Sequence, residues 1–273
     1  IVTFFVATKV QAQQPAFDQP AQPESSSFQF SKRLKIGAEL ISYRYVEPGL
    51  IEHVGVLYGA NAQLKWEASE MIYGVIDASI VAGKLNYNGA LCDVESNACS
   101  NYSAKTDDVI FRITHRFDFK VTEQFHIFAG PGIRYLFDRG ESSGFYTRLG
   151  LYLFAPVGVN LQIPLNDDSG LIFDLEYDIF ISGSMESRLS EVNSKWSDIT
   201  HKQGAGSGHK ITAGYEFNKQ TANPLQIALF YESWDIAASN YETLYVNGQA
   251  STKSYFEPKN FSQSVGIKGL MTF

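Results

Sequence analysis

The sequence has no long hydrophobic run, only two cysteines, and no excess of positive charge. Its mean hydropathy of -0.14 is too polar for a protein that crosses a membrane with helices. The net charge of -7 leaves no basic stripe, which argues against nucleic acid as a partner. Zinc-ligand spacing, a phosphate-binding loop and a nucleotide fingerprint are all missing, so neither a metal nor a cofactor is expected. Aromatic residues, by contrast, make up 14% of the chain, as in β-rich proteins.

From Leu34 onward, apolar and polar residues alternate, break at turn residues, and alternate again. This period of two is typical of β-strands with one apolar face and one polar face. We predict about ten strands, within a range of eight to twelve, each long enough for the roughly 9–11 residues of a tilted bilayer crossing. The expected strands lie near 34–46, 53–67, 72–86, 108–119, 125–138, 147–163, 171–183, 209–218, 225–236 and 261–273.

The connections between these strands alternate in length. Short turns follow every second strand, and the longer connections lie at 87–107, 184–208 and 237–259. This pattern predicts an all-β fold, an antiparallel up-and-down transmembrane β-barrel. A water-soluble barrel would instead place the apolar face inside, and periodicity alone does not separate the two. The C-terminal strand, the export signal and the loop asymmetry favour the membrane barrel.

Both ends of the chain carry information. Residues 1–12 are typical of the end of a secretory signal peptide, because a short apolar run precedes the small residues around Ala12. A short buried strand is the alternative for this segment. Residues 13–32 are rich in Pro, Ser and Gln and predict a linker before a barrel over 33–273. The last predicted strand alternates from Phe261 and ends on the aromatic Phe273.

In its architecture, export signal and C-terminal strand, the chain resembles bacterial outer-membrane β-barrel proteins of the small porin-like or OmpA/Opa-like kind. The resemblance covers residues 34–273. It implies a Gram-negative outer membrane, periplasmic termini and turns, and extracellular loops, with lipid and lipopolysaccharide around the barrel. It also implies that Phe273 is the C-terminal signal that the barrel-assembly machinery reads. The resemblance concerns architecture, so it identifies no ligand or solute.

If the apolar face meets lipid, the polar face lines the lumen and carries charges of both signs. Opposite charges in a narrow barrel are expected to pair and fill it, because an unpaired buried charge is very costly. The alternative is a thin selective channel that passes Arg112 and Arg116 on one side and the acidic residues of strand 171–183 on the other. The predicted lumen charges are Glu39, Lys65, Glu67, Asp77, Arg112, Arg116, Arg134, Asp174, Glu176, Asp178, Lys210, Glu216, Glu232 and Lys268.

Two prolines interrupt the strand pattern. Pro131 and Pro156 fall almost opposite each other in a predicted hairpin, and neighbouring glycines favour a bulge there. We therefore predict a local kink in this hairpin, which shapes the barrel or, as an alternative, provides a lateral opening for a lipid. The closely spaced Cys92 and Cys99 predict a disulfide that closes a small loop, with two free thiols as the alternative.

The sequence offers little sign of catalysis. Omptin proteases are ten-stranded outer-membrane barrels that use an acidic pair and an Asp–His couple, and Asp107–Asp108 and Asp198–His201 are the nearest equivalents. Their spacing departs from that pattern, because two residues separate Asp198 from His201 where omptins have one. Barrel lipases use a Ser–His pair, and neither His115 nor His126 has a serine in such a motif. We therefore predict no catalytic residue and no enzyme.

The predicted long loops carry exposed aromatic residues, which suit contact with a ligand or partner. The alternative is that the loops pack on one another and cap the barrel. The sequence thus favours a non-enzymatic surface barrel that binds through its loops or stabilises the membrane. A small ion or solute channel comes second, and a lipid or peptide hydrolase third. The candidate contact residues are Trp196, Trp234, Tyr241, Tyr245, Tyr255 and Phe256.

Overall fold

The structure is a computed structural model that describes residues 32–92, 99–142 and 144–273. The predicted signal-peptide remnant at 1–12 and the linker up to residue 31 lie outside this range. Among the described residues, no helix is long and apolar enough to cross a membrane.

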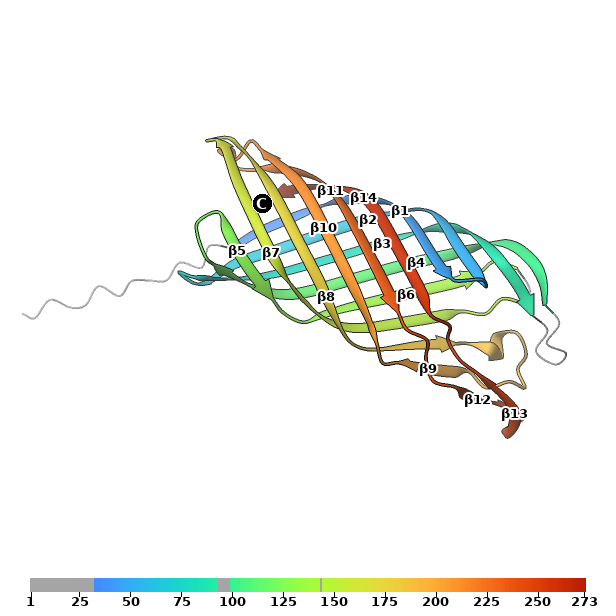
Figure 1. Cartoon of the computed structure of the whole chain (residues 1–273). Coiled ribbons are helices and arrows are strands. Elements are labelled where there is room, and N and C mark those ends of the chain that lie inside the picture. Colours follow the sequence, from blue (N-terminus) through green and yellow to red (C-terminus); the bar gives the residue numbers. More distant parts are fainter. Residues whose placement is uncertain (1–31, 93–98, 143) are drawn as a thin grey trace, which may run out of the picture.

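The described chain closes into one antiparallel ring (Figure 1). Its sheet holds twelve strand segments, of which β5 and β6 are two halves of one strand and β9 pairs only with β8, so ten strands form the ring. The first and last strands pair and close it. The segments are β1 (Lys32–Glu47), β2 (Ile51–Ser69), β3 (Ile72–Cys92), β4 (Cys99–Lys120), β5 (Phe125–Ala129), β6 (Gly132–Gly140), β7 (Arg148–Asn166), β8 (Ser169–Ser187), β9 (Ile199–Gln203), β10 (Gly206–Phe217), β11 (Leu225–Ile236) and β14 (Asn260–Thr272).

These strands confirm the predicted antiparallel barrel of about ten strands. The end that carries the C-terminus and the beginning of β1 has short connections, and we call it the turn end. The amide of Phe273 donates to the carbonyl of Leu34 over 2.7 Å there. The opposite end, which we call the extended end, carries longer segments, including a hairpin of β12 (Glu242–Val246) and β13 (Gln249–Tyr255) (Figure 1).

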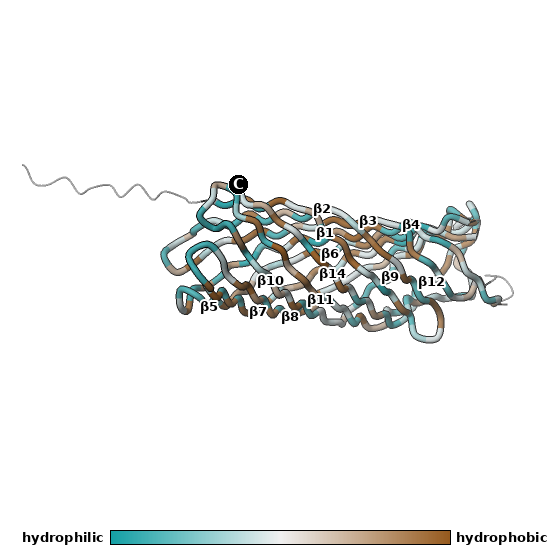
Figure 2. The backbone as a smooth tube through the Cα atoms, turned by 90° about the horizontal axis from the view of Figure 1, so that it is seen from above, coloured by the Kyte–Doolittle hydropathy of each residue, from teal (hydrophilic) through white to brown (hydrophobic). Residues whose placement is uncertain are grey.

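The outward face of the ring is apolar. Tyr58, Leu229 and Val265 each expose more than 60% of their surface, on three different strands. Figure 2 shows hydrophobic residues along the length of the strands and hydrophilic ones at the turns. A band of exposed apolar side chains around a closed barrel is suited to lipid and is the inverse of a water-soluble barrel.

The inward face combines aromatic and polar side chains. Tyr43, Tyr152, Phe154 and Trp234 belong to one buried hydrophobic cluster inside the ring. Buried glutamate, aspartate, arginine and histidine residues share the interior with them. The alternation along each strand therefore separates a lipid-facing surface from a filled, mixed interior.

The predicted interruption at Pro131 is confirmed. β5 ends at Ala129 and β6 begins at Gly132, because a proline has no amide hydrogen to donate to the ladder. The amide of Gly130 still donates to the Pro156 carbonyl over 3.1 Å, so strand pairing continues across the break. This closed seam gives no support to a lateral opening here.

The predicted bulge does not lie in that hairpin. Strand β7 pairs with β5 and β6 in the same register on both sides of the break, so no residue is inserted. The irregularity lies instead between β7 and β8, where Leu153 pairs with Ser182 but Phe154 pairs with Phe180. One extra residue in β8 lies between these two pairs, as in a bulge.

The segment 87–107 was expected to be a loop, but its described parts, 87–92 and 99–107, are strand. Strands β3 and β4 continue as a paired hairpin up to Cys92 and Cys99, with lengths of 21 and 22 residues. Aromatic rings support this extension, since Tyr87 and Tyr102 contact Phe145 at centroid distances of 5.0 and 5.5 Å. Outside the membrane neither strand face must be apolar, so the alternation fades although the strands continue.

The segments 184–208 and 237–259 are also more ordered than predicted. Strand β8 runs on to Ser187, a 3-10 turn η1 (Leu189–Glu191) follows, and β9 adds to the edge of β8. Leu189, Ile199 and Leu244 form a second buried hydrophobic cluster with Trp196 and Tyr255 packed against it. The β12–β13 hairpin turns at Asn247 and Gly248, whose positive φ angles of 52° and 78° suit a two-residue hairpin turn.

Candidate functional site

Ion pairs cross the middle of the lumen. Arg112 of β4 contacts Glu176, and its Nη2 lies 3.3 Å from the carboxylate of Asp178, both on β8. Its Nε lies 4.0 Å from Glu232 of β11, and its guanidinium lies over the ring of Phe154. Arg112 therefore joins three strands that lie apart around the ring, and its side chain is 5% exposed.

Other lumen charges pair in the same way. Arg116 lies 3.0 Å from Asp118 and 3.7 Å from Asp174, and Lys35 lies 2.9 Å from Glu216 near the turn end. Glu232 is shared by Arg112, Arg134 and Lys210. All fourteen sequence-predicted lumen charges are buried or half-buried in the structure.

At the extended end of the lumen, the ion pairs give way to a small cavity. Its volume is about 30 Å³, and Tyr45, His53, Asp108, Asp138 and Arg148 are among the residues that line it. Their strand neighbours Arg44, Lys84, Asp107 and Arg139 carry charges outward, so this level lies beyond the apolar band. The cavity therefore sits at the rim of the membrane-spanning region.

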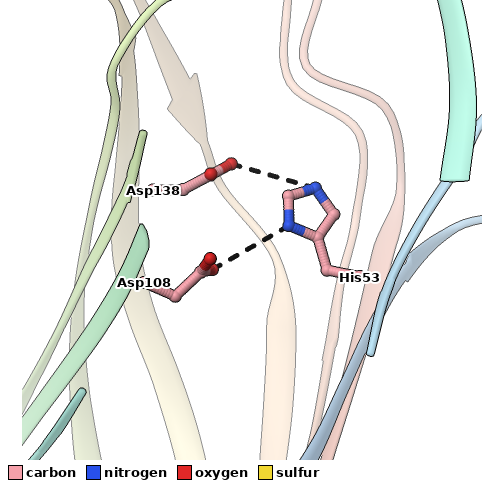
Figure 3. Close-up of side chains that lie close together, drawn as sticks. All are labelled: His53, Asp108 and Asp138. Carbon is pink, nitrogen blue, oxygen red and sulfur yellow. Dashed lines mark ion pairs between the residues drawn. The ribbon is translucent and has the colours of Figure 1, made fainter. Parts of the chain in front are cut away.

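Three side chains that can bind a proton or a metal meet in this cavity (Figure 3). His53 comes from β2, Asp108 from β4 and Asp138 from β6. The His53 Nδ1 lies 3.9 Å from Asp108 Oδ2, and its Nε2 lies 3.9 Å from Asp138 Oδ2. Both distances are too long for a hydrogen bond. The imidazole therefore stands between two carboxylates without bonding directly to either.

The surroundings hold this His–Asp–Asp cluster in place. The rings of Tyr45 and Tyr87 pack edge-on against His53 at 5.6 and 5.1 Å. Thr106 donates its hydroxyl to Asp108 Oδ1 over 2.5 Å. His53 is 2% exposed, and its Nε2 has no hydrogen-bond partner in the structure.

Beside the cluster, one guanidinium serves several carboxylates. Arg148 contacts Glu257, lies 2.7 Å from Glu47, and lies 3.9 Å from Asp138. Glu257 belongs to the connection between β13 and β14, outside the membrane-spanning strands. Burial raises the pKa of Glu257 to about 7, although the charge of Arg148 acts to lower it. Glu47 and Glu257 share the one positive charge of Arg148. Glu257 therefore retains its proton at pH values well above 4.5, the ordinary pKa of a glutamate.

This arrangement predicts a pH-dependent stability. Between about pH 4.5 and 7 the folded protein holds a proton on Glu257 that the unfolded chain has released. The free energy of unfolding should therefore fall as pH rises through this window, by roughly 1–3 kcal/mol. The variant Glu257→Gln cannot ionise and should show a flatter profile in urea unfolding of the refolded protein. As a control, Glu123→Gln changes a side chain that is 84% exposed and should leave the profile as it is. Equal slopes in all three proteins would contradict the assignment to Glu257.

The residues nearest to the omptin pattern, the acidic pair Asp107–Asp108 and the couple Asp198–His201, do not come together in the structure. Asp108 points into the lumen, but Asp107 points outward and pairs with Lys84. Asp198 accepts a hydrogen bond from the Ser190 amide, and His201 is buried in β9. No ion pair or hydrogen bond of the described chain joins this couple to the acidic pair.

The other histidines also lie apart from the cluster. His115 faces outward beside Trp66 and Phe117, and His126 is buried near the turn end beside Tyr73. No motif or spacing in the sequence singled out His53 or Asp138 as site residues. The only hint of this site in the sequence was the place of His53 on the polar face of β2.

The candidate loop contacts divide into two groups. Trp234 was expected to be a contact residue that leads into the loop 237–259, but it is 1% exposed inside the barrel, where its indole donates to Glu232 over 2.8 Å. Trp196 and Tyr255 pack on the second cluster. Three aromatic side chains remain at the surface of the extended end, and these are Tyr241, Tyr245 and Phe256.

The remaining predicted features lie at the two ends of the barrel. The backbone pairs Cys92 directly with Cys99 at the tip of the β3–β4 hairpin, as a disulfide there requires, and the bond itself stays a prediction of the sequence. Phe273 follows β14 at the turn end with 62% of its surface exposed. Its role in barrel assembly also stays a prediction.

No family model and no curated protein matches this sequence. The outer-membrane protease OmpT from Escherichia coli matches in structure, with 10% identity and a TM-score of 0.50 over 91% of this chain and 99% of that chain. The translocator domain of the autotransporter NalP from Neisseria meningitidis is 11% identical, with a TM-score of 0.40 over 87% of each chain. The attachment invasion locus protein Ail of Yersinia pestis is 9% identical, with a TM-score of 0.33 over 89% of this chain and 99% of that chain. Such low identities are informative about the fold alone, and the chain has the fold of bacterial outer-membrane β-barrel proteins, as the sequence resemblance implied.

Proposed function

We propose that this protein is a closed, non-enzymatic outer-membrane barrel that binds a ligand or partner outside the cell through its extended end. The observation that carries this proposal is the contrast between the lumen and the extended end. The lumen is filled by paired charges and aromatic rings, whereas the extended end forms an ordered surface with its own small core.

The filled lumen supports a closed barrel over a channel. A conducting path needs water-filled space beside the charges that select the ion. Here Arg112 and Arg134 are 5% and 2% exposed, and Glu176, Asp178 and Glu232 form ion pairs with them. The fully buried side chains of Tyr152, Phe154 and Trp234 occupy the lumen toward the extended end.

The extended end supports partner binding. We name the unit formed by η1, β9, β12 and β13 the platform; its core consists of Leu189, Ile199 and Leu244. Because this core orders the platform in advance, binding costs less conformational entropy than it would with free loops. Tyr241, Tyr245 and Phe256 expose 68%, 47% and 41% of their surfaces at this end, and Tyr241 contacts Phe256. Aromatic side chains of this kind are enriched at binding interfaces.

The proposed orientation follows from the two ends of the barrel. Short turns and both ends of the described chain lie together at the turn end. In outer-membrane barrels the short turns are periplasmic and the longer segments extracellular. The platform and the His–Asp–Asp cluster are thus assigned to the cell surface.

The non-enzymatic part of the proposal rests on access. Thr106 Oγ1 lies 3.4 Å from His53 Nδ1, so hydroxyl, imidazole and carboxylate occur in the order of a hydrolase triad. The Thr106 hydroxyl, however, donates to Asp108 and is fully buried, and His53 is 2% exposed. Neighbouring side chains therefore cover both the hydroxyl and the imidazole of this arrangement.

Two measurements test the proposal. Refolded protein in a planar bilayer should show no steady conductance steps, and reproducible ion-selective steps would instead support a channel. Cells that display the protein should bind at least one member of a panel of glycans and polypeptides, and the triple variant Tyr241→Ser, Tyr245→Ser and Phe256→Ser should lose that binding about tenfold or more. The matched control Met71→Ser with Leu165→Ser removes exposed apolar side chains at the turn end and should bind normally. Equal binding by both variants would show that the platform is not the binding surface.

A further inference from the structure

The His–Asp–Asp cluster presents two like charges face to face. Asp108 of β4 and Asp138 of β6 are direct register partners, and both point into the lumen. Like charges directly opposite on neighbouring strands destabilise a sheet. Arg148 is the register partner of Asp138, but it also contacts Glu47 and Glu257. One guanidinium therefore serves the carboxyl groups of Asp138, Glu47 and Glu257, and no ion pair of the described residues joins it to Asp108.

The imidazole supplies an independent observation. His53 is 2% exposed, yet its Nε2 lacks a hydrogen-bond partner and points toward Asp138 (Figure 3). Buried polar atoms are nearly always satisfied, by protein, by water or by an ion. The unpartnered nitrogen and the uncompensated carboxylates face the same small cavity. A cation that accepts nitrogen and oxygen ligands would bind the unpartnered nitrogen and pair with the carboxylates at the same time.

The distances suit such an ion. Zinc binds histidine nitrogen and carboxylate oxygen at about 2.0–2.2 Å, so two of its ligands lie up to about 4 Å apart. The His53 Nε2 lies 3.9 Å from Asp138 Oδ2, whereas the 3.9 Å separation from Asp108 is measured from Nδ1 on the other edge of the ring. One ligand atom from each of the three residues lies within 4.8 Å of the others, so side-chain movements of under ~1 Å bring all three to one ion. The cavity of about 30 Å³ exceeds the roughly 10–15 Å³ that one water-sized occupant needs.

We propose that His53, Asp108 and Asp138 form a binding site for a divalent transition metal ion of the zinc type. One imidazole nitrogen and two carboxylates supply three ligands, and a water completes the coordination. The Thr106 hydroxyl orients the Asp108 carboxylate, as outer partners of metal ligands commonly do. Because the ligands come from β2, β4 and β6, the ion joins three strands at the extended end of the lumen. The imidazole favours zinc over magnesium and calcium, which prefer oxygen ligands alone.

The test uses the full chain without a histidine tag, refolded in detergent under non-reducing conditions and freed of metal with a chelator. Zinc binding is measured by competition with a chromophoric chelator, and magnesium and calcium are measured in the same way. We expect one equivalent of zinc at the site, and weaker binding of the other two ions. Cobalt should give a visible absorption spectrum of a tetrahedral site with nitrogen and oxygen ligands.

Matched variants separate this site from chance binding. His53→Gln should lower zinc affinity roughly a hundredfold, and Asp138→Asn should do the same to a smaller degree. The control His209→Gln removes an exposed outward histidine and should leave affinity unchanged. Zinc should also raise the thermal unfolding midpoint of the unaltered protein but not of His53→Gln.

Several results would overturn the proposal. It fails if the unaltered protein takes up no stoichiometric zinc, or if His53→Gln binds zinc as well as the control. If His53→Gln does not fold, Asp138→Asn and the cobalt spectrum of the unaltered protein decide. A spectrum of octahedral cobalt with water and carboxylate ligands would contradict coordination by the imidazole.

Discussion

Replacement of Arg112 by methionine is expected to destabilise the barrel by about 3–5 kcal/mol, because it leaves buried carboxylates without their counter-charge. Arg112 contacts Glu176, Asp178 and Glu232, which come from two strands across the lumen. Methionine keeps much of the side-chain volume and the contact with Phe154 but removes the charge. Urea unfolding in lipid vesicles and heat-dependent gel mobility measure the loss.

A second variant separates lost charge from lost packing. If the cost comes from uncompensated carboxylates, Glu176→Gln with Asp178→Asn should recover at least half of the stability that Arg112→Met loses. The matched control is Arg44→Met, which breaks an outward pair with Glu52 whose side chains are 52% and 36% exposed. Exposed pairs contribute about 0–1 kcal/mol, so this variant should be close to neutral. Equal losses from Arg112→Met and Arg44→Met would show that the lumen is hydrated rather than closed.

Leu229→Arg is expected to destabilise the protein in a bilayer by about 2–4 kcal/mol, the cost of a cation near the middle of the lipid band. Leu229 is 61% exposed on the outward face of β11, where it pairs with Ile267 and Ala213. Its surroundings are apolar on both sides. The measurement compares refolding yield and urea unfolding in vesicles.

Leu50→Arg is the matched control for this prediction. Leu50 is 52% exposed in the connection between β1 and β2 at the extended end, where water surrounds the chain. This change should alter stability by no more than about 0.5 kcal/mol. A water-soluble barrel would tolerate both arginines equally, so equal behaviour would contradict the assignment of the outward apolar face to lipid.

The alternation of residue types was enough to predict the barrel. Every ring strand overlaps one of the predicted segments, because lipid on one side and a polar interior on the other impose a period of two. The prediction failed where that asymmetry ends. Residues 87–92 and 99–107 continue the paired strands β3 and β4, and 237–259 contain another hairpin. These segments lie at the extended end, where neither face must be apolar. A strand of this kind carries little pattern that a sequence can reveal.

The candidate metal site could not be predicted in the same way. His53, Asp108 and Asp138 are separated by 55 and 30 positions in the chain, and no spacing motif joins them. They meet because of the registers between β2, β3, β4 and β6, which place the three residues at one level of the lumen. A shift of one residue in any of these pairings would turn a side chain outward.

The sequence by itself determined where the ring strands lie and which residues share a face of each strand, because these depend on local alternation. The tertiary structure decided which charges pair, that Trp234 fills the lumen instead of a loop, and that the extended end has a core of its own. These features depend on contacts across the ring between residues far apart in the chain. Ring closure and register fix such contacts, and neither is written in any single stretch of sequence.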